Sequence, residues 1–391
     1  MRVAHIITRM IIGGAQENTL YNCEDLLRLF GDEVLLVTGP ALGPEGDLLA
    51  QGRGGTVPIE LVPTLRRAID PRRDPASYFA LQRVVRKFRP NVVHTHSAKA
   101  GFLGRLAAWS LRVPAVVHTV HGAPFHPYQS APARALFRWC EWYAAQRCHA
   151  LISVADAMTD QLVQAKVAPR GKFTTIYSGM DVEPFLAADA SRESTRAQLG
   201  FSPQHVVIGK IARLFHLKGH ADVIRAAAEV VKANERVRFL FIGDGILRDT
   251  LQSQIAAAGL TRHFHFAGLV PPHRIPELIG ALDILVHASL REGLPRALPQ
   301  ALIAGKPVVS YDIDGAREVA ITGETGFLVP PRWDALVEPL VKLAADPQLR
   351  LRLGHTGRQR FTDPFRHEFM TRRIRELYQR VLGRSSANQP A

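Results

Sequence analysis

The sequence predicts two α/β domains, each a parallel sheet covered on both faces by helices in the manner of a Rossmann fold. Apolar, β-branched runs alternate with helix-length segments along the chain, and near-continuous hydrophobic strands of this kind are typical of parallel sheets buried on both faces. A length of 391 residues suits two domains of ordinary size. The rhythm of strands and helices occurs once in each half, so we expect two sheets.

Ten apolar runs are the predicted strands, five in each half of the chain. Those of the first half span residues 3–7, 34–38, 92–96, 115–119 and 151–154. Those of the second half span residues 206–212, 238–242, 263–266, 284–287 and 307–310. Because ligands of open parallel sheets bind outside the carboxyl ends of the strands, we expect the site in a cleft where the two sheets face one another.

The predicted boundary between the domains lies near residues 180–200, where a turn-like stretch ends the first sheet and a polar segment precedes the next strand. The chain is therefore divided into a first domain, a second domain and a C-terminal helix with a loose tail from Ser385: residues 1–180, 181–363 and 364–391. The C-terminal helix has apolar residues at helical spacing: Met370, Ile374, Leu377, Tyr378 and Val381. Because it follows a complete second domain, we expect it to cross back to the first.

Composition and charge narrow the classes of protein and of partner. A hydrophobic content of 47% and a charged content of 21% are ordinary for a folded globular protein. Three cysteines, Cys23, Cys140 and Cys148, form no Cys-x-x-Cys pair and are too few for a disulfide framework, which disfavours a structural zinc and predicts a reducing compartment. The net charge of +14 favours anionic partners: nucleotide phosphates, nucleic acid or the acidic face of a bilayer.

Neither a secretory signal nor a transmembrane span is expected. The first residues run directly into a β-type segment without a small-residue cleavage site, and no later window reaches the length of a membrane-spanning helix. These features predict a cytoplasmic protein.

The stretch Arg291-Glu292-Gly293-Leu294-Pro295 predicts a sugar-nucleotide site. It lies between two predicted strands, where the Glu292 carboxylate can accept hydrogen bonds from sugar hydroxyls while Gly293 and Leu294 offer backbone N–H groups. Gln300 falls on the following helix, and its amide suits ribose hydroxyls because it both donates and accepts. The alternatives are a surface turn for Glu292 and a partly exposed helix position for Gln300.

Two basic residues follow the first strand of the second domain. Arg213 and Lys218 lie on one loop that leads into a helix, and both can reach a diphosphate, the arginine with a planar fork and the lysine as a point charge. The alternative is a solvated basic loop. The motif around Glu292 favours the diphosphate interpretation, since two independent features then agree.

Gly13 and Gly14 follow the first strand and precede a helix. Glycine there lets a ligand approach the backbone closely, while helix N–H groups point at a phosphate. Ordinary turn chemistry is the alternative. The pair is not part of a Gly-x-Gly-x-x-Gly fingerprint, and no dinucleotide pattern begins the second sheet, so a nicotinamide or flavin enzyme is disfavoured.

Histidines and aspartates near strand ends are further candidates. His121 ends a first-domain strand, as a ligand group or as a hydrogen-bonded structural residue. His94 and His96 share one face of a strand, yet no cysteine or third ligand lies near them in sequence, so a metal is disfavoured. Asp312 and Asp314 match an Asp-x-Asp pattern, but in a turn after a buried strand they are more simply turn formers and helix caps.

Aromatic and basic residues are interleaved between Arg134 and Arg147. The aromatic residues are Phe137, Trp139, Trp142 and Tyr143. Such a face can rest on an anionic membrane or receive a lipid-linked acceptor. The alternative is a core-facing helix, because aromatic residues at helical spacing are usually buried and Glu141 interrupts the face. Basic clusters at residues 66–67, 72–73 and 86–89 support the membrane interpretation.

Taken together, these residues resemble the retaining family-four glycosyltransferases of the GT-B fold, over nearly the whole chain. The matching motifs are a Gly-Gly loop, a His-Gly at a strand end and an Arg…Lys-Gly pair: Gly13-Gly14, His121-Gly122, and Arg213 with Lys218-Gly219. The family's Glu-x7-Glu signature is here Glu292 followed by Gln300. The second acid is thus replaced by its amide, which keeps hydrogen bonding to a ribose available.

The resemblance also implies roles for residues that no motif above explains. The backbone at Gly268, Leu269 and Val270 would meet the nucleotide base, and Glu318 would face the donor. The implied reaction has the sugar leaving a nucleoside diphosphate while the acceptor attacks the same face, with no protein nucleophile, no metal and no cofactor beyond the donor. The most similar members build bacterial exopolysaccharide or other surface glycans.

The sequence therefore predicts transfer of a hexose-type sugar from a nucleotide donor to a glycan or lipid-linked acceptor. Arg213 and Lys218 would stabilise the departing diphosphate, and Glu292 and His121 would orient the sugar. Two alternatives are an epimerase of sugar nucleotides with the same fold and a non-catalytic basic protein that binds nucleic acid or a membrane surface. The presence of Arg213, Lys218 and Glu292 argues against a non-catalytic protein. We therefore expect no nucleic-acid partner, and we expect the enzyme to contact an anionic membrane peripherally.

Overall fold

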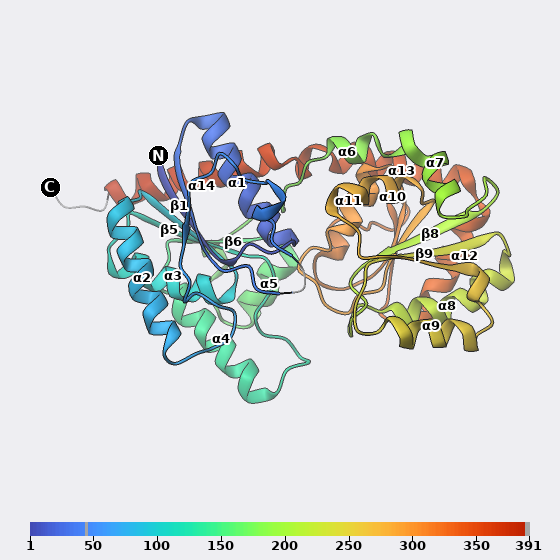
Figure 1. Ribbon diagram of the computed structural model, residues 1–391, viewed down its shortest axis with the longest axis horizontal. Helices are drawn as coiled ribbons and strands as arrows, with labels where there is room; N and C mark the ends of the chain where they lie inside the picture. Colours follow the sequence, from blue (N-terminus) through green and yellow to red (C-terminus); the bar gives the residue numbers. More distant parts are fainter. Residues whose placement is uncertain (44–45, 388–391) are drawn as a thin grey trace. The chain divides into compact units, whose positions relative to one another are not determined.

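The computed structural model describes residues 1–43 and 46–387, which form two compact units (Figure 1). The first unit comprises Met1–Met180 and the segment that begins at Pro364, and the second comprises Asp181–Asp363. Each unit contains one parallel sheet with helices on both faces, so the predicted fold class is confirmed. No helix in the described residues is long and apolar enough to cross a membrane.

The sheet of the first unit has seven parallel strands in the order β3-β2-β1-β4-β5-β6-β7. The strands are β1 (Arg2–Arg9), β2 (Glu33–Gly39), β3 (Ile59–Leu61), β4 (Val92–His96), β5 (Ala115–Val120), β6 (Ala150–Ser153) and β7 (Phe173–Thr175). One face carries α1 (Gly14–Phe30) and α14 (His367–Ala387). The remaining helices are α2 (Arg73–Phe88), α3 (Ala98–Ser110) and α4 (Ala131–Ala145) on the other face, and α5 (Asp156–Gln164) beside β6 and β7.

The sheet of the second unit has six parallel strands in the order β10-β9-β8-β11-β12-β13. The strands are β8 (Val206–Ile211), β9 (Val237–Ile242), β10 (Phe264–Gly268), β11 (Ile284–His287), β12 (Val308–Tyr311) and β13 (Gly326–Val329). One face carries α8 (His220–Ala233), α9 (Arg248–Ala257) and α12 (Val337–Ala345). The other carries α6 (Glu183–Leu186), α7 (Arg192–Gln198), α10 (Ile275–Gly280), α11 (Ala297–Ile303) and α13 (Pro347–Phe361).

Three strands of the structure have no counterpart among the ten predicted ones: β3, β7 and β13. All three are edge strands of three or four residues. The side chains of β3 are exposed and those of β7 are only half-buried. A short edge strand is covered on fewer sides, so it lacks the continuous apolar run by which a central strand is recognised.

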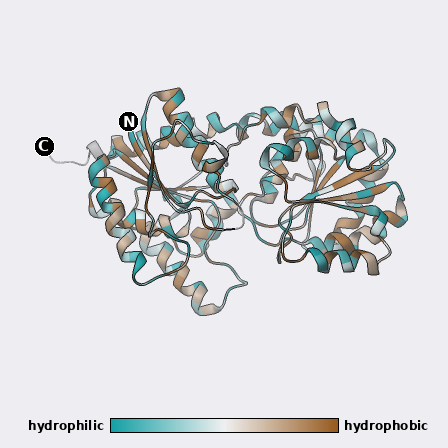
Figure 2. Ribbon diagram, in the orientation of Figure 1, coloured by the Kyte–Doolittle hydropathy of each residue, from teal (hydrophilic) through white to brown (hydrophobic). Residues whose placement is uncertain are grey.

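Each unit has its own apolar core between its sheet and its helices. Figure 2 shows largely hydrophobic strands, whereas hydrophobic and hydrophilic residues alternate along the helices. In the second unit, Phe239 and Phe241 of β9 pack with Val223 of α8 and Ile284 of β11. The cores hold the sheets rigid, so that the loops at the carboxyl ends of the strands have fixed starting points.

Helix α14 belongs to the core of the first unit. Its residues Met370, Ile374, Leu377 and Tyr378 are buried together with residues of α1 and of the central strands. The helix continues to Ala387, so the expectation of a loose tail from Ser385 is wrong for residues 385–387, and residues 388–391 lie outside the described part of the chain. Apolar residues at the start of a helix do not reveal where its polar end stops.

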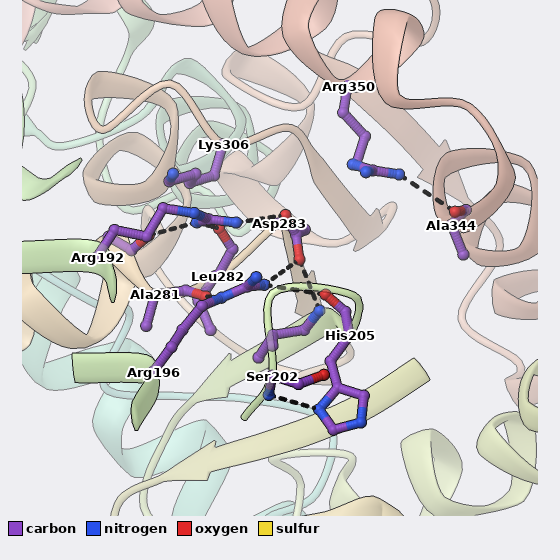
Figure 3. Close-up of polar contacts among 12 residues, drawn as sticks. Arg192, Arg196, Ser202, His205, Ala281, Leu282, Asp283, Lys306, Ala344 and Arg350 are labelled. Atoms are coloured by element: carbon purple, nitrogen blue, oxygen red, sulfur yellow. Dashed lines mark hydrogen bonds and ion pairs between the residues drawn. The ribbon is translucent and has the colours of Figure 1, made fainter. Parts of the chain in front are cut away.

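The polar segment before β8 is structured as well (Figure 3). Arg192 and Arg196, both on α7, donate to opposite oxygens of Asp283 at 2.6 and 2.5 Å, and the amide of Val207 donates to the same carboxylate at 2.7 Å. Asp283 immediately precedes β11, so this ion-paired group lies at the amino end of the central strands, opposite the edge where ligands bind. It fastens the beginning of the second unit to its sheet.

Candidate functional site

Both sheets reverse their winding direction beside their first strand. In the second sheet the chain passes from β8 to β9 and β10 on one side, and then to β11, β12 and β13 on the other. In the first sheet the same reversal separates β1 from β4. Loops that leave two neighbouring strands in opposite directions open a crevice at the carboxyl ends, which is where open α/β sheets hold their ligands. The loops after β8 and β11, and after β1 and β4, are therefore the candidate ligand-binding loops.

Lys218 and Glu292 meet at the reversal in the second sheet. The ammonium of Lys218, on the loop after β8, donates to Oε1 of Glu292, on the loop after β11, at 2.6 Å. Both side chains keep about a fifth of their surface exposed, 23% and 21%. Gly219 has a φ of 69°, and a Cβ there would lie 1.8 Å from the carbonyl oxygen of Ala288, so only glycine allows the first loop to pack directly on the second.

The loop that carries Glu292 is fastened from the loop after β12. The amide of Glu292 donates to Oδ2 of Asp314 at 2.6 Å, and the amide of Gly315 donates to the carbonyl of Gly293 at 3.0 Å. Burial and the neighbouring Glu292 carboxylate raise the pKa of Asp314. This bond, together with that between Arg317 and Asp312, makes the two aspartates loop-forming residues, as expected of turn formers.

Buried basic groups lie beneath the ion pair. Burial raises the pKa of Glu292, but Lys218 and His287 beside it outweigh burial and lower it overall, so the carboxylate is anionic. His287 ends β11 with its Nε2 3.7 Å from Oε1 of Glu292, and burial lowers its pKa to about 3. Lys210, fully buried on β8, has a pKa lowered to about 7 by burial and by the charge of Lys218. His220, at the start of α8, is also neutral because burial lowers its pKa to about 2.

Sequence reasoning missed Lys210, His220 and His287. Nζ of Lys210 has no hydrogen-bond partner among the described residues, which is uncommon for a buried ammonium. Its signal in the sequence is a lysine inside an otherwise apolar predicted strand. The signal for His287 is a histidine at the last position of such a strand, where the side chain reaches the ligand-binding edge.

The other predicted donor-binding residues of the second unit lie at the same edge of the sheet. Arg213 follows β8, exposed, with its guanidinium 5.0 Å from the ring centre of Phe215. Gln300 is half-buried on α11, in the connection between β11 and β12. Gly268 is the last residue of β10, and Leu269 and Val270 follow it. Gly293 and Leu294 follow β11. Glu318 follows β12 and ends the 3-10 helix Asp314–Glu318.

The site residues of the first unit form a chain of imidazoles. His121 follows β5, and its Nε2 lies 3.2 Å from Nδ1 of His96 at the end of β4. Nε2 of His96 lies 3.0 Å from Nδ1 of His5 on β1. Burial lowers the pKa of His5 to about 3 and that of His96 well below its usual value, so both rings are neutral. Each neutral ring donates from one nitrogen only, so the tautomer of His121 is coupled to those of His96 and His5.

Three of these imidazoles lie close enough together to be considered as metal ligands: His5, His94 and His96. The sequence lacked a third ligand near His94 and His96, and the structure brings His5 there from the neighbouring strand. Both nitrogens of His94, however, are already bonded to hydroxyls, Nδ1 to Tyr378 at 2.5 Å and Nε2 to Thr119 at 2.7 Å. The geometry of His94 thus fits a hydrogen-bond network, and the three residues do not form a ligand set.

Gly13 and Gly14 lie at the start of α1, beside this chain of histidines at the carboxyl end of β1. The φ of Gly13 is 174°, extended backbone that any residue adopts, and a Cβ there would approach only Oε1 of Gln16, at 2.8 Å. The backbone conformation therefore does not require glycine at this position. What glycine contributes is open access to the first amides of the helix, which have no side-chain cap.

Glycosyltransferase family models match both units of the chain. A family model described as Glycosyltransferase Family 4 matches residues 12–184, and one described as Glycosyl transferases group 1 matches residues 191–360. The chain is 28% identical to the UDP-Gal:alpha-D-GlcNAc-diphosphoundecaprenol alpha-1,3-galactosyltransferase of Escherichia coli, over 97% of this chain and 96% of that enzyme. It is 29% identical to the 2-deoxystreptamine glucosyltransferase of Streptomyces kanamyceticus, over 72% and 74% of the two chains.

Solved structures show the same fold at lower identity. Anabaena HepE in complex with UDP and glucose superposes with a TM-score of 0.82 at 21% identity, covering 97% of this chain and all of that one. Sucrose-phosphate synthase from Thermosynechococcus elongatus gives 0.81 at 18% identity, covering 98% of this chain. The likeness thus extends over both units.

Proposed function

Because this chain belongs to the family-four glycosyltransferases of the GT-B fold, we propose that it transfers a hexose-type sugar from a nucleoside-diphosphate sugar, with retention, to a lipid-linked or glycan acceptor in surface-glycan synthesis. The observation that carries the proposal is the Lys218–Glu292 ion pair at the reversal of the second sheet. A cation for a diphosphate and an anion for sugar hydroxyls are held side by side where a ligand binds. An epimerase or a non-catalytic binding protein is not favoured by this family.

We assign the diphosphate to Lys218 and Arg213, with the amides of Gly13 and Gly14 as further donors. Charge develops on the diphosphate as the sugar departs, and preorganised cations stabilise that charge most in the transition state. Lys218 has more than one donor hydrogen, so it can keep its bond to Glu292 while it contacts a phosphate oxygen.

We assign the sugar and the nucleoside to the remaining site residues. The Glu292 carboxylate and the His121 imidazole accept or donate hydrogen bonds to sugar hydroxyls, a positioning role that aligns the anomeric carbon with the acceptor. Amides of Gly293 and Leu294 and the side chain of Glu318 complete the sugar site. Gln300 bonds the ribose, and the backbone of residues 268–270 contacts the base.

The proposed chemistry is a substitution at the anomeric carbon. The bond from that carbon to the diphosphate oxygen breaks, and a bond to the acceptor hydroxyl oxygen forms on the same face. The acceptor proton passes to the departing phosphate, so no protein nucleophile is consumed. The protein contributes orientation of both reactants and stabilisation of the leaving anion.

The donor base is proposed to be uracil and the acceptor a lipid diphosphate. The Escherichia coli relative, aligned over nearly its whole length, is named for UDP-Gal and for a diphosphoundecaprenol acceptor, and the Anabaena relative was solved with UDP-glucose. The net charge of +14 and the exposed Trp139 and Trp142 of α4 support a cytoplasmic protein that contacts the inner face of the membrane.

Purified protein tested against UDP-, GDP- and ADP-sugars would examine the proposal. We expect UDP and UDP-hexoses alone to raise the melting temperature, and release of UDP to increase severalfold when a GlcNAc-diphosphate lipid is added. An α-configured anomeric carbon in the product of an α-linked donor would support retention. UDP release that no sugar-lipid acceptor increases, from a donor that binds, would count against lipid-linked transfer.

A further inference from the structure

The first unit contains an apolar pocket between α3, α4 and the segment that follows β3. Its volume is about 320 Å³. Most of its lining is apolar: Ile69, Ala98, Phe102, Leu103, Pro124, Leu136 and Phe137. The charged side chains in the lining are Arg67, Asp74, Lys99 and Glu141. Asp74 is paired with Lys99 and Glu141 with the buried Arg105, so these groups are already engaged and most of a sugar's hydroxyls would lose water without finding partners. The pocket therefore suits a hydrocarbon.

The pocket lies at the ligand-binding edge of the first sheet. Its walls come from residues 67–74 after β3, from the beginning of α3 after β4, and from Pro124 after β5. The loop that contributes Pro124 also begins with His121, three residues earlier. A hydrocarbon in this pocket and a sugar held at the carboxyl ends of the strands could therefore be parts of the same acceptor molecule.

The rim of the pocket is basic. Residues 66–73 contain four arginines, all of them exposed, and Arg67 lines the pocket. Lys99 at the rim is paired with Asp74, and Asp70 accepts hydrogen bonds from the amides of Arg72 and Arg73 at 2.9 and 3.0 Å. Asp70 and Asp74 are thus occupied by hydrogen bonds and an ion pair within the segment, whereas the exposed guanidinium groups can attract an anion.

Apolar surface continues from the pocket along the outer face of α4. Leu136 lines the pocket and is itself 49% exposed. Trp139 and Trp142, about one and two turns further along, are 51% and 44% exposed, and Trp139 stacks on Tyr143 with ring centres 5.2 Å apart. Of the two interpretations of these aromatic residues, the core-facing one is therefore wrong for the two tryptophans. They extend the apolar path outward, as at a membrane interface.

We propose that this pocket holds the first isoprenoid units of an acceptor whose sugar is carried on a lipid diphosphate, with the diphosphate at the rim formed by Arg66 and Arg67. The proposal rests on the proposed function and adds to it the site of the lipid. The basic rim, the apolar pocket and the outer face with its tryptophans follow one another in the same order as three parts of the lipid acceptor. These parts are the diphosphate, the first isoprenoid units and the section of the chain that lies in the bilayer. The rest of a long chain lies along Leu136, Trp139 and Trp142.

Cys140 reports on the pocket in the native protein. It lines the pocket and is half-buried, whereas Cys23 and Cys148 are fully buried, so a maleimide should react first at Cys140. We expect farnesyl-diphosphate-linked GlcNAc to slow labelling at least fivefold, read by mass spectrometry. The same compound with a methyl group in place of farnesyl should not. Protection by the methyl compound, protection by empty phosphatidylglycerol vesicles alone, or no protection by the farnesyl compound would overturn the proposal.

A substitution that fills the pocket tests its role in catalysis. Cys140→Phe should raise KM for the farnesyl-linked acceptor at least tenfold and leave KM for the methyl-linked acceptor and for the donor unchanged. Gln146→Phe places the same ring at the exposed end of α4, outside the pocket, and should change none of these values. Equal loss with both acceptors would contradict a lipid site. Should Cys140→Phe not fold, the labelling of the native chain still decides.

The two experiments separate this proposal from the proposed function. Labelling needs neither donor nor turnover, so protection without any transfer would leave the lipid pocket intact and remove lipid-linked transfer. Transfer to the farnesyl-linked and the methyl-linked acceptor without protection of Cys140 would refute the lipid pocket and leave the proposed function standing.

Discussion

Nζ of Lys218 lies 2.6 Å from Oε1 of Glu292, although 74 residues separate them in the chain. The pair joins the loops after β8 and β11, the two strands between which the second sheet reverses direction. Lys218 lowers the pKa of Glu292 against the effect of burial, so the carboxylate is held in its anionic form.

Removing either proposed diphosphate cation should impair turnover without unfolding the protein. Lys218→Ala and Arg213→Ala are each expected to lower kcat about 100-fold or more, since each removes a charged donor to the leaving group from a loop rather than core volume. Lys218→Ala should have the larger effect, because it also leaves Glu292 without its cation. Steady-state UDP release measures both, and Lys232→Ala, an exposed lysine in the last turn of α8, is the control. Native turnover in both single variants would refute the assigned role.

Replacing Gln300 by the glutamate of the family's Glu-x7-Glu signature should preserve donor binding. Gln300→Glu is expected to bind UDP at least as tightly as the native chain, because a carboxylate accepts from two ribose hydroxyls. Isothermal titration calorimetry gives the comparison. If the variant no longer bound UDP, Gln300 would have to act as a hydrogen-bond donor in this protein.

The buried histidines should make stability fall in mild acid. Burial depresses the pKa of His5 to about 3 in the folded state, whereas the unfolded chain has a value near 6.5. Below pH 6.5 the unfolded state therefore binds protons that the folded state does not, and the stability contributed by neutral His5 is lost as pH falls from about 6.5 toward 3. The free energy of urea unfolding at pH 7.5 and 5.0 should differ less in His5→Asn than in the native protein.

The control for this experiment is His216→Asn. His216 is exposed, so its removal should leave the pH dependence of unfolding unchanged. An undiminished pH dependence in His5→Asn would mean that His5 is not a neutral group in the folded protein.

Asp283 should matter for stability and not for chemistry. Its carboxylate pairs with Arg192 and Arg196, and truncation leaves two partly buried guanidinium groups without an anion (Figure 3). Asp283→Ala is therefore expected to cost about 3–5 kcal/mol of unfolding free energy. Asp312→Ala, which removes the partner of the exposed Arg317, should cost about 1 kcal/mol or less. Denaturant unfolding distinguishes the two, and similar losses in both would contradict the structural role of Asp283.

Central strands were predictable from the sequence, as was the edge strand β10, whereas the other three edge strands were not. The residues of β1, β4 and β8 are buried almost throughout, and the apolar, β-branched runs within them are visible in a local window. The edge strands β3, β7 and β13 were missed because they are short, and because the side chains of β3 are exposed and those of β7 only half-buried. Likewise, the polar segment that became α7 is helical because Asp283, 87 residues away from Arg196, fixes it to the sheet.

By itself, the sequence determined that two parallel sheets form and which residue types stand at their strand ends, since hydrophobic periodicity and the glycine, lysine and glutamate motifs are local properties of the chain. Only the tertiary structure decided which of these residues meet. Strand order puts β8 beside β11 and β1 beside β4, which joins Lys218 to Glu292 and His5 to His96 across 74 and 91 residues. The same packing buried Lys210 and exposed Trp139, because burial depends on what covers a residue in space.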